Sequence, residues 1–264
     1  WSKKICSEPI TSVTYNNQGN QVAFSTFQGE IYVSSIYDGS FIIPLEQSYT
    51  TSPIISCHFH PIEDNFILCS TRDGFIFLFD LVKGEIATFS RHLGSNILSM
   101  AIDPYGESFA IGCADGSIRI HNIETLQRME ALVKKGGRTS TPSTSHVYSV
   151  LYYPDDPNII ISTSGSDKLA FWDLRTGNFE RILPGINAKY QNSIDVYSTN
   201  IIVASSRDSK QLEVYDFGTC KKIREFNIDN PQPQLPKAPH GLEALSSRSL
   251  PVNNQSSVKN SIFA

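Results

Sequence analysis

Apolar and polar residues alternate in short runs along most of the chain. Runs such as SVTY from Ser12 and IRIH from Ile118 place apolar side chains at every second position. Alternate residues of an extended chain point to opposite faces, so this pattern predicts strands with one face toward a core. Clusters of Asn, Asp, Pro and Gly separate the runs and mark turns. No segment has the period of an amphipathic helix, and the sequence therefore predicts an all-β fold.

The same arrangement of residues recurs along the chain. The stretch SGSDKLAFWDLRTG, from Ser164 to Gly177, combines a small polar run, a strand that ends in Trp172-Asp173, and a Thr-Gly turn. Four other copies carry a different dipeptide at this place, at spacings of 42 to 51 residues. These dipeptides are Ser34-Ser35, Phe79-Asp80, His121-Asn122 and Tyr215-Asp216.

A further pair of strand patterns precedes each copy, as in SVTYNNQGNQVAFS from Ser12. One unit therefore has four predicted strands in about forty residues, which is typical of an antiparallel β-propeller blade. The sequence predicts five such blades. Their approximate ranges are 12–45, 54–89, 97–133, 147–183 and 193–228.

These repeats resemble the WD40-repeat family over about Ser12 to Ile228. The resemblance implies a WD40-like β-propeller. In that family a His between blades, a Ser or Thr on the second strand, an Asp in the next turn, and the Trp form a hydrogen-bonded tetrad. Only one copy here keeps Trp-Asp, and His92 is the nearest substitute for the family's Gly-His pair. The chain is thus identified as a diverged member whose blades depend mostly on apolar packing.

The resemblance also gives structural roles to residues near the Trp position. Two turn aspartates lie six residues before it, whereas the fourth and fifth copies have theirs five and seven residues before it. We therefore expect no complete tetrad. The repeat positions with a predicted structural role are Asp73, Asp115, Asp167, Trp172, Asp173, Asp208, Tyr215 and Asp216.

The two ends of the chain do not form a full unit. Residues 1–11 are expected to supply the outer strand of a partial blade, and residues 229–264 form a Pro/Ser/Asn-rich tail. The chain begins at Trp1 instead of Met, which indicates a processed form or a segment of a longer protein. Five blades can close into a ring, or the ring can be completed by the termini, by missing sequence or by a partner, because an open ring leaves unpaired strand edges.

Composition narrows the function classes. The 264 residues are 40% hydrophobic and 18% charged, which is typical of a globular chain, and the net charge of −4 argues against a general nucleic-acid binder. The five cysteines are odd in number and lack CxxC spacing, so they indicate free thiols in a reducing, cytoplasmic environment. A cilium, the cytoskeleton or the nucleus are alternative locations. No apolar run has the length of a membrane span.

One insertion separates the third and fourth copies. The stretch KKGGRTSTPSTSH, residues 134–146, is flexible and polar in composition. Lys134, Lys135 and Arg138 form a candidate basic docking loop, and Thr141, before Pro142, is a candidate phosphorylation site. A solvated loop insertion without function is the alternative interpretation.

Arg72 and Arg207 occupy the same place in two copies, directly before Asp73 and Asp208. In the family this place opens on the narrower face, where peptide ligands often dock. Two arginines on one face suit an acidic or phosphorylated partner segment, because guanidinium groups bind such anions bidentately. Alternatively, each arginine pairs with its neighbouring aspartate.

The sequence offers little for catalysis. His58 and His60 are spaced to share a strand face, but no third metal ligand accompanies them, and GxSxG, GxxxxGK[ST] and GxGxxG motifs are absent. We expect that the protein is not an enzyme and that it binds neither a metal nor a cofactor. The sequence favours a non-catalytic scaffold that docks partner proteins as a subunit of a multiprotein complex. The alternatives are a structural subunit of a ciliary or other cytoskeletal assembly and an enzyme with a site in the central channel.

Overall fold

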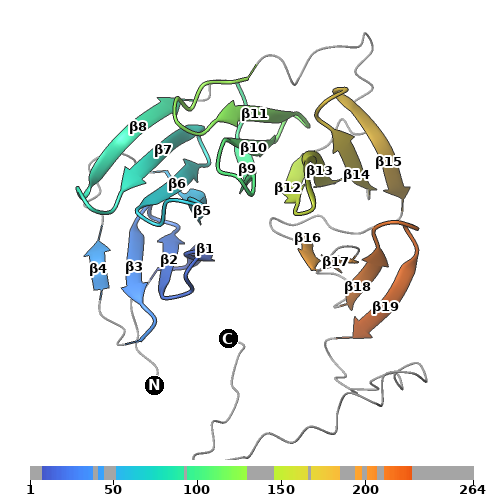
Figure 1. Ribbon diagram of the computed structural model, residues 1–264, viewed down its shortest axis with the longest axis horizontal. Helices are drawn as coiled ribbons and strands as arrows, with labels where there is room; N and C mark the ends of the chain where they lie inside the picture. Colours follow the sequence, from blue (N-terminus) through green and yellow to red (C-terminus); the bar gives the residue numbers. More distant parts are fainter. Residues whose placement is uncertain are drawn as a thin grey trace, which may run out of the picture. The chain divides into compact units, whose positions relative to one another are not determined.

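The computed structural model describes residues 8–37, 41–44, 52–91, 94–129, 146–165, 168–184, 194–197, 201–206 and 211–227. The chain divides into two compact units, Trp1–Asp229 and Asn230–Ala264, and all described residues belong to the first. Regular structure within these residues consists of strands in five antiparallel sheets (Figure 1). In the same residues, no helix is long and apolar enough to cross a membrane.

Chain neighbours pair in every sheet, so each sheet is a meander. The first sheet contains β1 (Ile10–Tyr15), β2 (Gln21–Thr26), β3 (Ile31–Ser35) and β4 (Phe41–Pro44). The second contains β5 (Ile54–Phe59), β6 (Phe66–Thr71), β7 (Phe75–Asp80) and β8 (Glu85–Arg91). The third contains β9 (Ile97–Ile102), β10 (Ser108–Cys113) and β11 (Ile118–Asn122). The fourth contains β12 (Val147–Tyr153), β13 (Asp156–Ser164), β14 (Lys168–Asp173) and β15 (Asn178–Pro184). The fifth contains β16 (Ile194–Tyr197), β17 (Ile201–Ser206), β18 (Gln211–Asp216) and β19 (Lys222–Asn227).

Strand register shows that the five sheets are copies of one plan. The Trp position of the third strand always lies opposite one equivalent residue of the second strand. These pairs are Val22↔Ser34, Ile67↔Phe79, Phe109↔His121, Ile160↔Trp172 and Ile202↔Tyr215. In the four sheets that have a fourth strand, the pairing of third and fourth strands also shifts directly before this position. The all-β prediction of antiparallel blades is confirmed.

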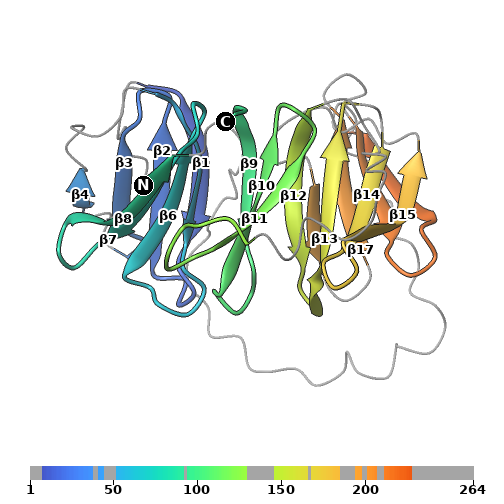
Figure 2. The same ribbon diagram turned by 90° about the horizontal axis from the view of Figure 1, so that it is seen from above.

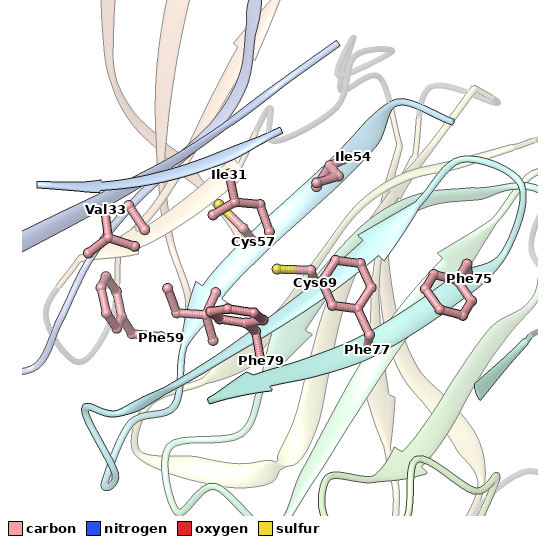
Figure 3. Packing of buried hydrophobic residues seen from close by; sticks show 11 residues of the cluster. Ile31, Val33, Ile54, Cys57, Phe59, Cys69, Phe75, Phe77 and Phe79 are labelled. Atoms are coloured by element: carbon pink, nitrogen blue, oxygen red, sulfur yellow. The ribbon is translucent and has the colours of Figure 1, made fainter. Parts of the chain in front are cut away.

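Successive sheets pack against each other in chain order. Their first strands touch in turn, since β1 contacts β5, β5 contacts β9, β9 contacts β12, and β12 contacts β16. Figure 2 shows the strands of neighbouring sheets side by side. Each pair of sheets shares a buried apolar cluster. In the cluster between the first two sheets, Ile31 and Val33 face Cys57, Phe59 and further side chains of the second sheet (Figure 3).

The first sheet has an exposed apolar face. Tyr15 is 63% exposed and Val13 54%, whereas the equivalent side chains of the second sheet, Phe59 and Cys57, are 6% and 0% exposed. The difference arises because the first sheet covers Phe59 and Cys57, while no described sheet covers Val13 and Tyr15.

One strand begins earlier than the sequence predicts. Ile10 and Thr11 were expected in the outer strand of a partial blade, but they belong to β1, because Ile10 pairs with Thr26 across a bulge. The third sheet has three strands in its described residues, followed by an isolated bridge between His121 and Arg128. The remainder of the predicted 97–133 blade lies outside the described residues.

Candidate interaction surface

The residue after the Trp position closes the turn between the third and fourth strands. Asp80 accepts hydrogen bonds from the backbone N–H groups of Val82 (2.9 Å) and Lys83 (3.1 Å). Asp173, Asp216 and Asn122 accept equivalent bonds in their own sheets, at 2.9, 2.6 and 2.8 Å. The Lys83 N–H lowers the pKa of Asp80, and the hydroxyl of Thr219 lowers that of Asp216. These acceptors satisfy main-chain donors and hold the turns, which is a structural task.

Two parts of the family's tetrad occur, in different sheets. Trp172 donates from Nε1 to Oγ of Ser162 on the second strand, at 2.9 Å. In the second sheet, the Thr71 hydroxyl donates to Asp73 in the turn that follows. The described residues do not include three other candidates for tetrad positions: Asp167, Asp208 and His92. The Tyr215 hydroxyl bonds its own strand, at Glu213 Oε2 (2.9 Å).

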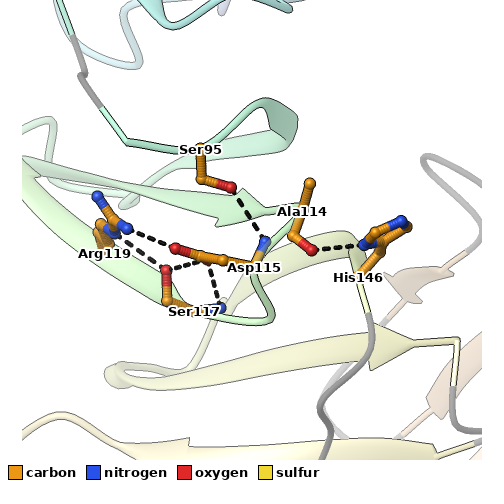
Figure 4. Close-up of polar contacts among 6 residues, drawn as sticks. All are labelled: Ser95, Ala114, Asp115, Ser117, Arg119 and His146. Carbon is orange, nitrogen blue, oxygen red and sulfur yellow. Dashed lines mark hydrogen bonds and ion pairs between the residues drawn. The ribbon is translucent and has the colours of Figure 1, made fainter.

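Asp115 lies at the centre of a polar network in the β10–β11 turn (Figure 4). Its carboxylate accepts from Ser117 Oγ at 2.6 Å and pairs with Arg119 Nη2 at 2.7 Å. Partial burial raises its pKa, but the bonds from Ser117 and the Arg119 charge outweigh this, so the pKa is lowered. Ser95 Oγ accepts from the Asp115 N–H, which ties the turn to the segment before β9. Most hydrogen-bonding capacity of Asp115 is therefore used within the sheet.

Arg72 is exposed and does not pair with Asp73. Burial has the largest single effect on the pKa of Asp73 and raises it, but hydrogen bonds from Thr71 and Ser52 outweigh it together with the Arg91 charge, so the pKa is lowered. Within the described ranges, the Arg72 guanidinium makes no hydrogen bond or ion pair, so the local Arg72–Asp73 pair does not form. The joint site with Arg207 stays a prediction, because Arg207 lies outside the described residues.

The predicted docking loop cannot be placed on this surface. Lys134, Lys135, Arg138 and the candidate phosphorylation site Thr141 all lie outside the described residues.

His58 and His60 do not form a metal-binding pair. β5 ends at Phe59, and His60 begins the next turn, where its Nδ1 accepts from the N–H groups of Ile62 (3.3 Å) and Glu63 (3.0 Å). His58 is half-buried, and its desolvation lowers its pKa. Among the described residues, no group of three His, Cys, Asp or Glu side chains is arranged for a metal ion.

His60 performs the task that an amide or a carboxylate performs in neighbouring sheets. At the equivalent places, Asn16 Oδ1 accepts from the backbone of Asn20 and Gln21, and Asp103 Oδ1 accepts from Tyr105. His60 also bonds the next sheet, since its Nε2 lies 3.2 Å from the Gly106 carbonyl oxygen. The imidazole thus joins the second and third sheets as well as closing its own turn.

A groove of about 630 Å³ opens beside this His60–Gly106 contact. The turns of the second and third sheets and part of β8 line it, and three glutamates stand around it: Glu63, Glu107 and Glu124. This groove could not be predicted from the sequence. Its lining comes from segments far apart in the chain, and only the equal positions of the turns in the repeats pointed to their proximity.

Comparison with known proteins agrees with the repeat geometry. A family model described as "WD domain, G-beta repeat" matches residues 83–122, which run from the end of the turn before β8 through β11. This span holds one fourth strand and the first three strands of the next sheet, so one sequence repeat is shared between two sheets. The chain therefore contains a WD40 repeat and resembles WD40-repeat proteins.

Curated relatives of this WD40 chain are proteins of several kinds. It is 27% identical over 172 residues to human "U3 small nucleolar RNA-associated protein 4 homolog", which covers 64% of this chain and 23% of that protein. It is 31% identical over 127 residues to "GATOR2 complex protein WDR24" of Danio rerio, covering 47% and 15%. It is 24% identical over 258 residues to "Cilia- and flagella-associated protein 52" of Macaca fascicularis, covering 81% and 42%. The WD40 chain therefore spans less than half the length of these relatives.

Proposed function

We propose that this WD40 chain is a non-catalytic scaffold that docks partner proteins within a multiprotein complex. The observation that carries the proposal is the use of the polar repeat positions. Asp80, Asp173, Asp216 and Asn122 all bind main-chain groups of their own turns. The repeats thus build a rigid frame whose turns differ in sequence, and such turns on a rigid frame are suited to binding.

The name of one relative, "GATOR2 complex protein WDR24", supports a role in assemblies. The names of the relatives refer to different assemblies, so they favour the general scaffold role and not the ciliary alternative in particular. The same proposal includes three further statements: the chain does not catalyse a reaction, it lies in a reducing intracellular compartment, and it does not bind nucleic acid directly.

Two regions are proposed as partner-binding elements. One is the pair Arg72 and Arg207, for an acidic or phosphorylated segment. The other is the 134–146 loop, with Thr141 as its phosphorylation switch.

Affinity purification of the tagged full chain from its native cells, after chemical crosslinking, tests the proposal. We expect defined partner proteins at near-stoichiometric ratio that co-migrate with the chain in size-exclusion chromatography. Migration of the chain at its own 29.4 kDa, without partners, would falsify the scaffold role.

Variants of the full chain then locate the contact. Deletion of 136–144 tests the loop, and Arg72→Glu/Arg207→Glu tests the arginine pair. The matched control is Arg128→Glu/Lys221→Glu, which makes the same charge change at two other exposed positions. Partner recovery should fall with the test variants and persist with the control; full recovery with both test variants removes these two elements as binding sites.

A further inference from the structure

The groove between the second and third sheets has an apolar floor. Phe66 and Leu78 come from the second sheet, and Ile123 follows β11 of the third. All three belong to the cluster that joins these sheets, so the groove exposes the border of an interface that is otherwise buried. Its volume of about 630 Å³ lies within the range typical of ligand sites.

Charge around this floor has one sign. Glu63, Glu107 and Glu124 are exposed and come from three different turns. Neither lysine nor arginine lines the groove, and the three carboxylates make no hydrogen bond or ion pair within the described part of the chain. Like charges held around an apolar surface favour a cation there, because an opposite charge relieves their mutual repulsion.

The rim adds apolar contact area beside the carboxylates. Tyr105 is 61% exposed and Ile62 65% exposed, and both line the groove. A tyrosine ring attracts a cation over its face and offers a large apolar surface at a low cost in side-chain entropy. The aliphatic stems of lysine and arginine cover apolar surface while the charged group reaches an anion. This combination of floor, rim and charge fits a basic side chain next to an apolar one.

The groove is also held in a fixed shape. Gly106 lies against the His60 ring, whose Nε2 is 3.2 Å from the Gly106 carbonyl oxygen. His60 Nδ1 at the same time accepts from the backbone of Ile62 and Glu63, two groove residues. The turns that carry Glu63 and Tyr105 are therefore linked to each other. A preformed site loses little free energy in ordering its side chains on binding.

We propose that this groove docks a segment of a partner protein that carries a lysine or arginine beside an apolar residue. The proposal rests on the scaffold function proposed above and names one of its contacts. It involves a different surface from the Arg72/Arg207 pair and the opposite partner charge. A nucleic acid is not the occupant, because its phosphates would meet three carboxylates.

Fluorescence anisotropy with the full chain tests the groove. The probes are labelled synthetic peptides with a central arginine or lysine flanked by leucine or phenylalanine, and matched peptides with glutamine at the centre. We expect the basic peptides to bind and the glutamine peptides to bind about tenfold more weakly, as for loss of a charged contact in an interface. Failure of every basic peptide to bind overturns the proposal.

Two sets of substitutions separate the groove from overall charge. Glu63→Gln/Glu107→Gln/Glu124→Gln removes the groove carboxylates, and Glu85→Gln/Asp195→Asn/Glu225→Gln removes three exposed carboxylates that do not line it. The first variant should weaken binding by about tenfold and the second by less than about twofold. Equal losses in both variants mean nonspecific charge attraction and overturn the proposal, as does unchanged binding in the first.

Two further measurements identify the occupant and separate this proposal from the scaffold function. Tyr105→Ala should weaken binding of the apolar-flanked peptides, and free spermidine should not compete at the peptide's own concentration; equal competition by spermidine overturns a protein segment as the occupant. If the crosslinked partners persist while the groove variant and the wild-type chain bind the peptides alike, the scaffold function holds and the groove proposal fails.

Discussion

Replacing Gly106 by alanine should destabilise the chain more than the equivalent change at Gly19, although the two glycines have similar backbone geometry. Both occupy the same place in the turn between first and second strands, with φ of 72° and 65°. The N–H of each bonds the carbonyl three residues earlier, at 3.0 Å. Their surroundings differ: a methyl group on Gly106 would lie 2.5 Å from Cε1 of His60, whereas one on Gly19 meets no atom within 4 Å.

Comparing the two positions separates the cost of the left-handed backbone from the cost of moving the His60 ring. A left-handed backbone costs an L-residue about 1–2 kcal/mol, and the less flexible unfolded chain returns about 0.5 kcal/mol, so Gly19→Ala should cost about 1 kcal/mol. At Gly106 the His60 ring must also move, which breaks its bonds to Ile62 and Glu63 and to the Gly106 carbonyl. With about 1 kcal/mol for each of these bonds, Gly106→Ala should cost about 3–4 kcal/mol.

Urea unfolding of the full chain, followed by circular dichroism, measures both costs. A third comparison introduces Gly106→Ala into a His60→Ala background, where the ring is absent and the added cost should fall to about 1 kcal/mol. Equal costs for Gly19→Ala and Gly106→Ala in the wild-type background refute the reasoning. So does a Gly106→Ala cost that does not change when His60 is removed.

Other predictions concern the Trp position, the exposed face of the first sheet and His58. Trp172→Phe removes the hydrogen bond to Ser162 and should lower the free energy of unfolding by about 1 kcal/mol. Ser162→Ala in the same chain should lower it little further. Fully additive losses in thermal unfolding of the double variant argue against this bond. Tyr15→Ala should change the free energy of unfolding by less than about 0.5 kcal/mol, whereas Phe59→Ala at the equivalent position should lower it by about 3–5 kcal/mol. Similar losses for the two variants would show that another surface covers Tyr15. Desolvation lowers the pKa of His58 below the value of about 6.5 for an unfolded histidine. The stability contributed by the neutral imidazole is therefore complete above about pH 6.5. It is lost as the pH falls toward the lowered pKa, by at most about 1.4 kcal/mol per pH unit. His58→Gln should flatten the decline of the urea midpoint between neutral and acid pH, and an unchanged slope contradicts this assignment.

The repeats could be predicted because they depend on local signals. Alternation along a strand and turn residues after it are readable in sequence, and they identified the dipeptides from Ser34-Ser35 to Tyr215-Asp216 at equivalent places. The third sheet was equally clear from its strands, since His121 lies opposite Phe109 as predicted by the common plan.

The contacts between sheets were harder to predict, because they join residues far apart in the chain. The spacing of His58 and His60 could not reveal the contact of His60 with Gly106, which lies 46 residues later and belongs to the next sheet. Asp73 looked like a partner of Arg72, yet a shorter hydroxyl side chain, that of Thr71, reaches it. Glu63 and Glu107 are far apart in the sequence, and only the structure places both at one groove.

The three side chains that accept the first-turn N–H groups are an amide, an imidazole and a carboxylate: Asn16, His60 and Asp103. In these three sheets the acceptor at that place is not a particular residue, whereas the fourth sheet has Tyr153 there, whose hydroxyl donates to Asp155. Related blades can therefore keep the same hydrogen-bond register after their sequences have diverged. A search for distant relatives that scores any acceptor at this position, followed by the strand pairing opposite the Trp position, should find members that a Trp-Asp signature misses.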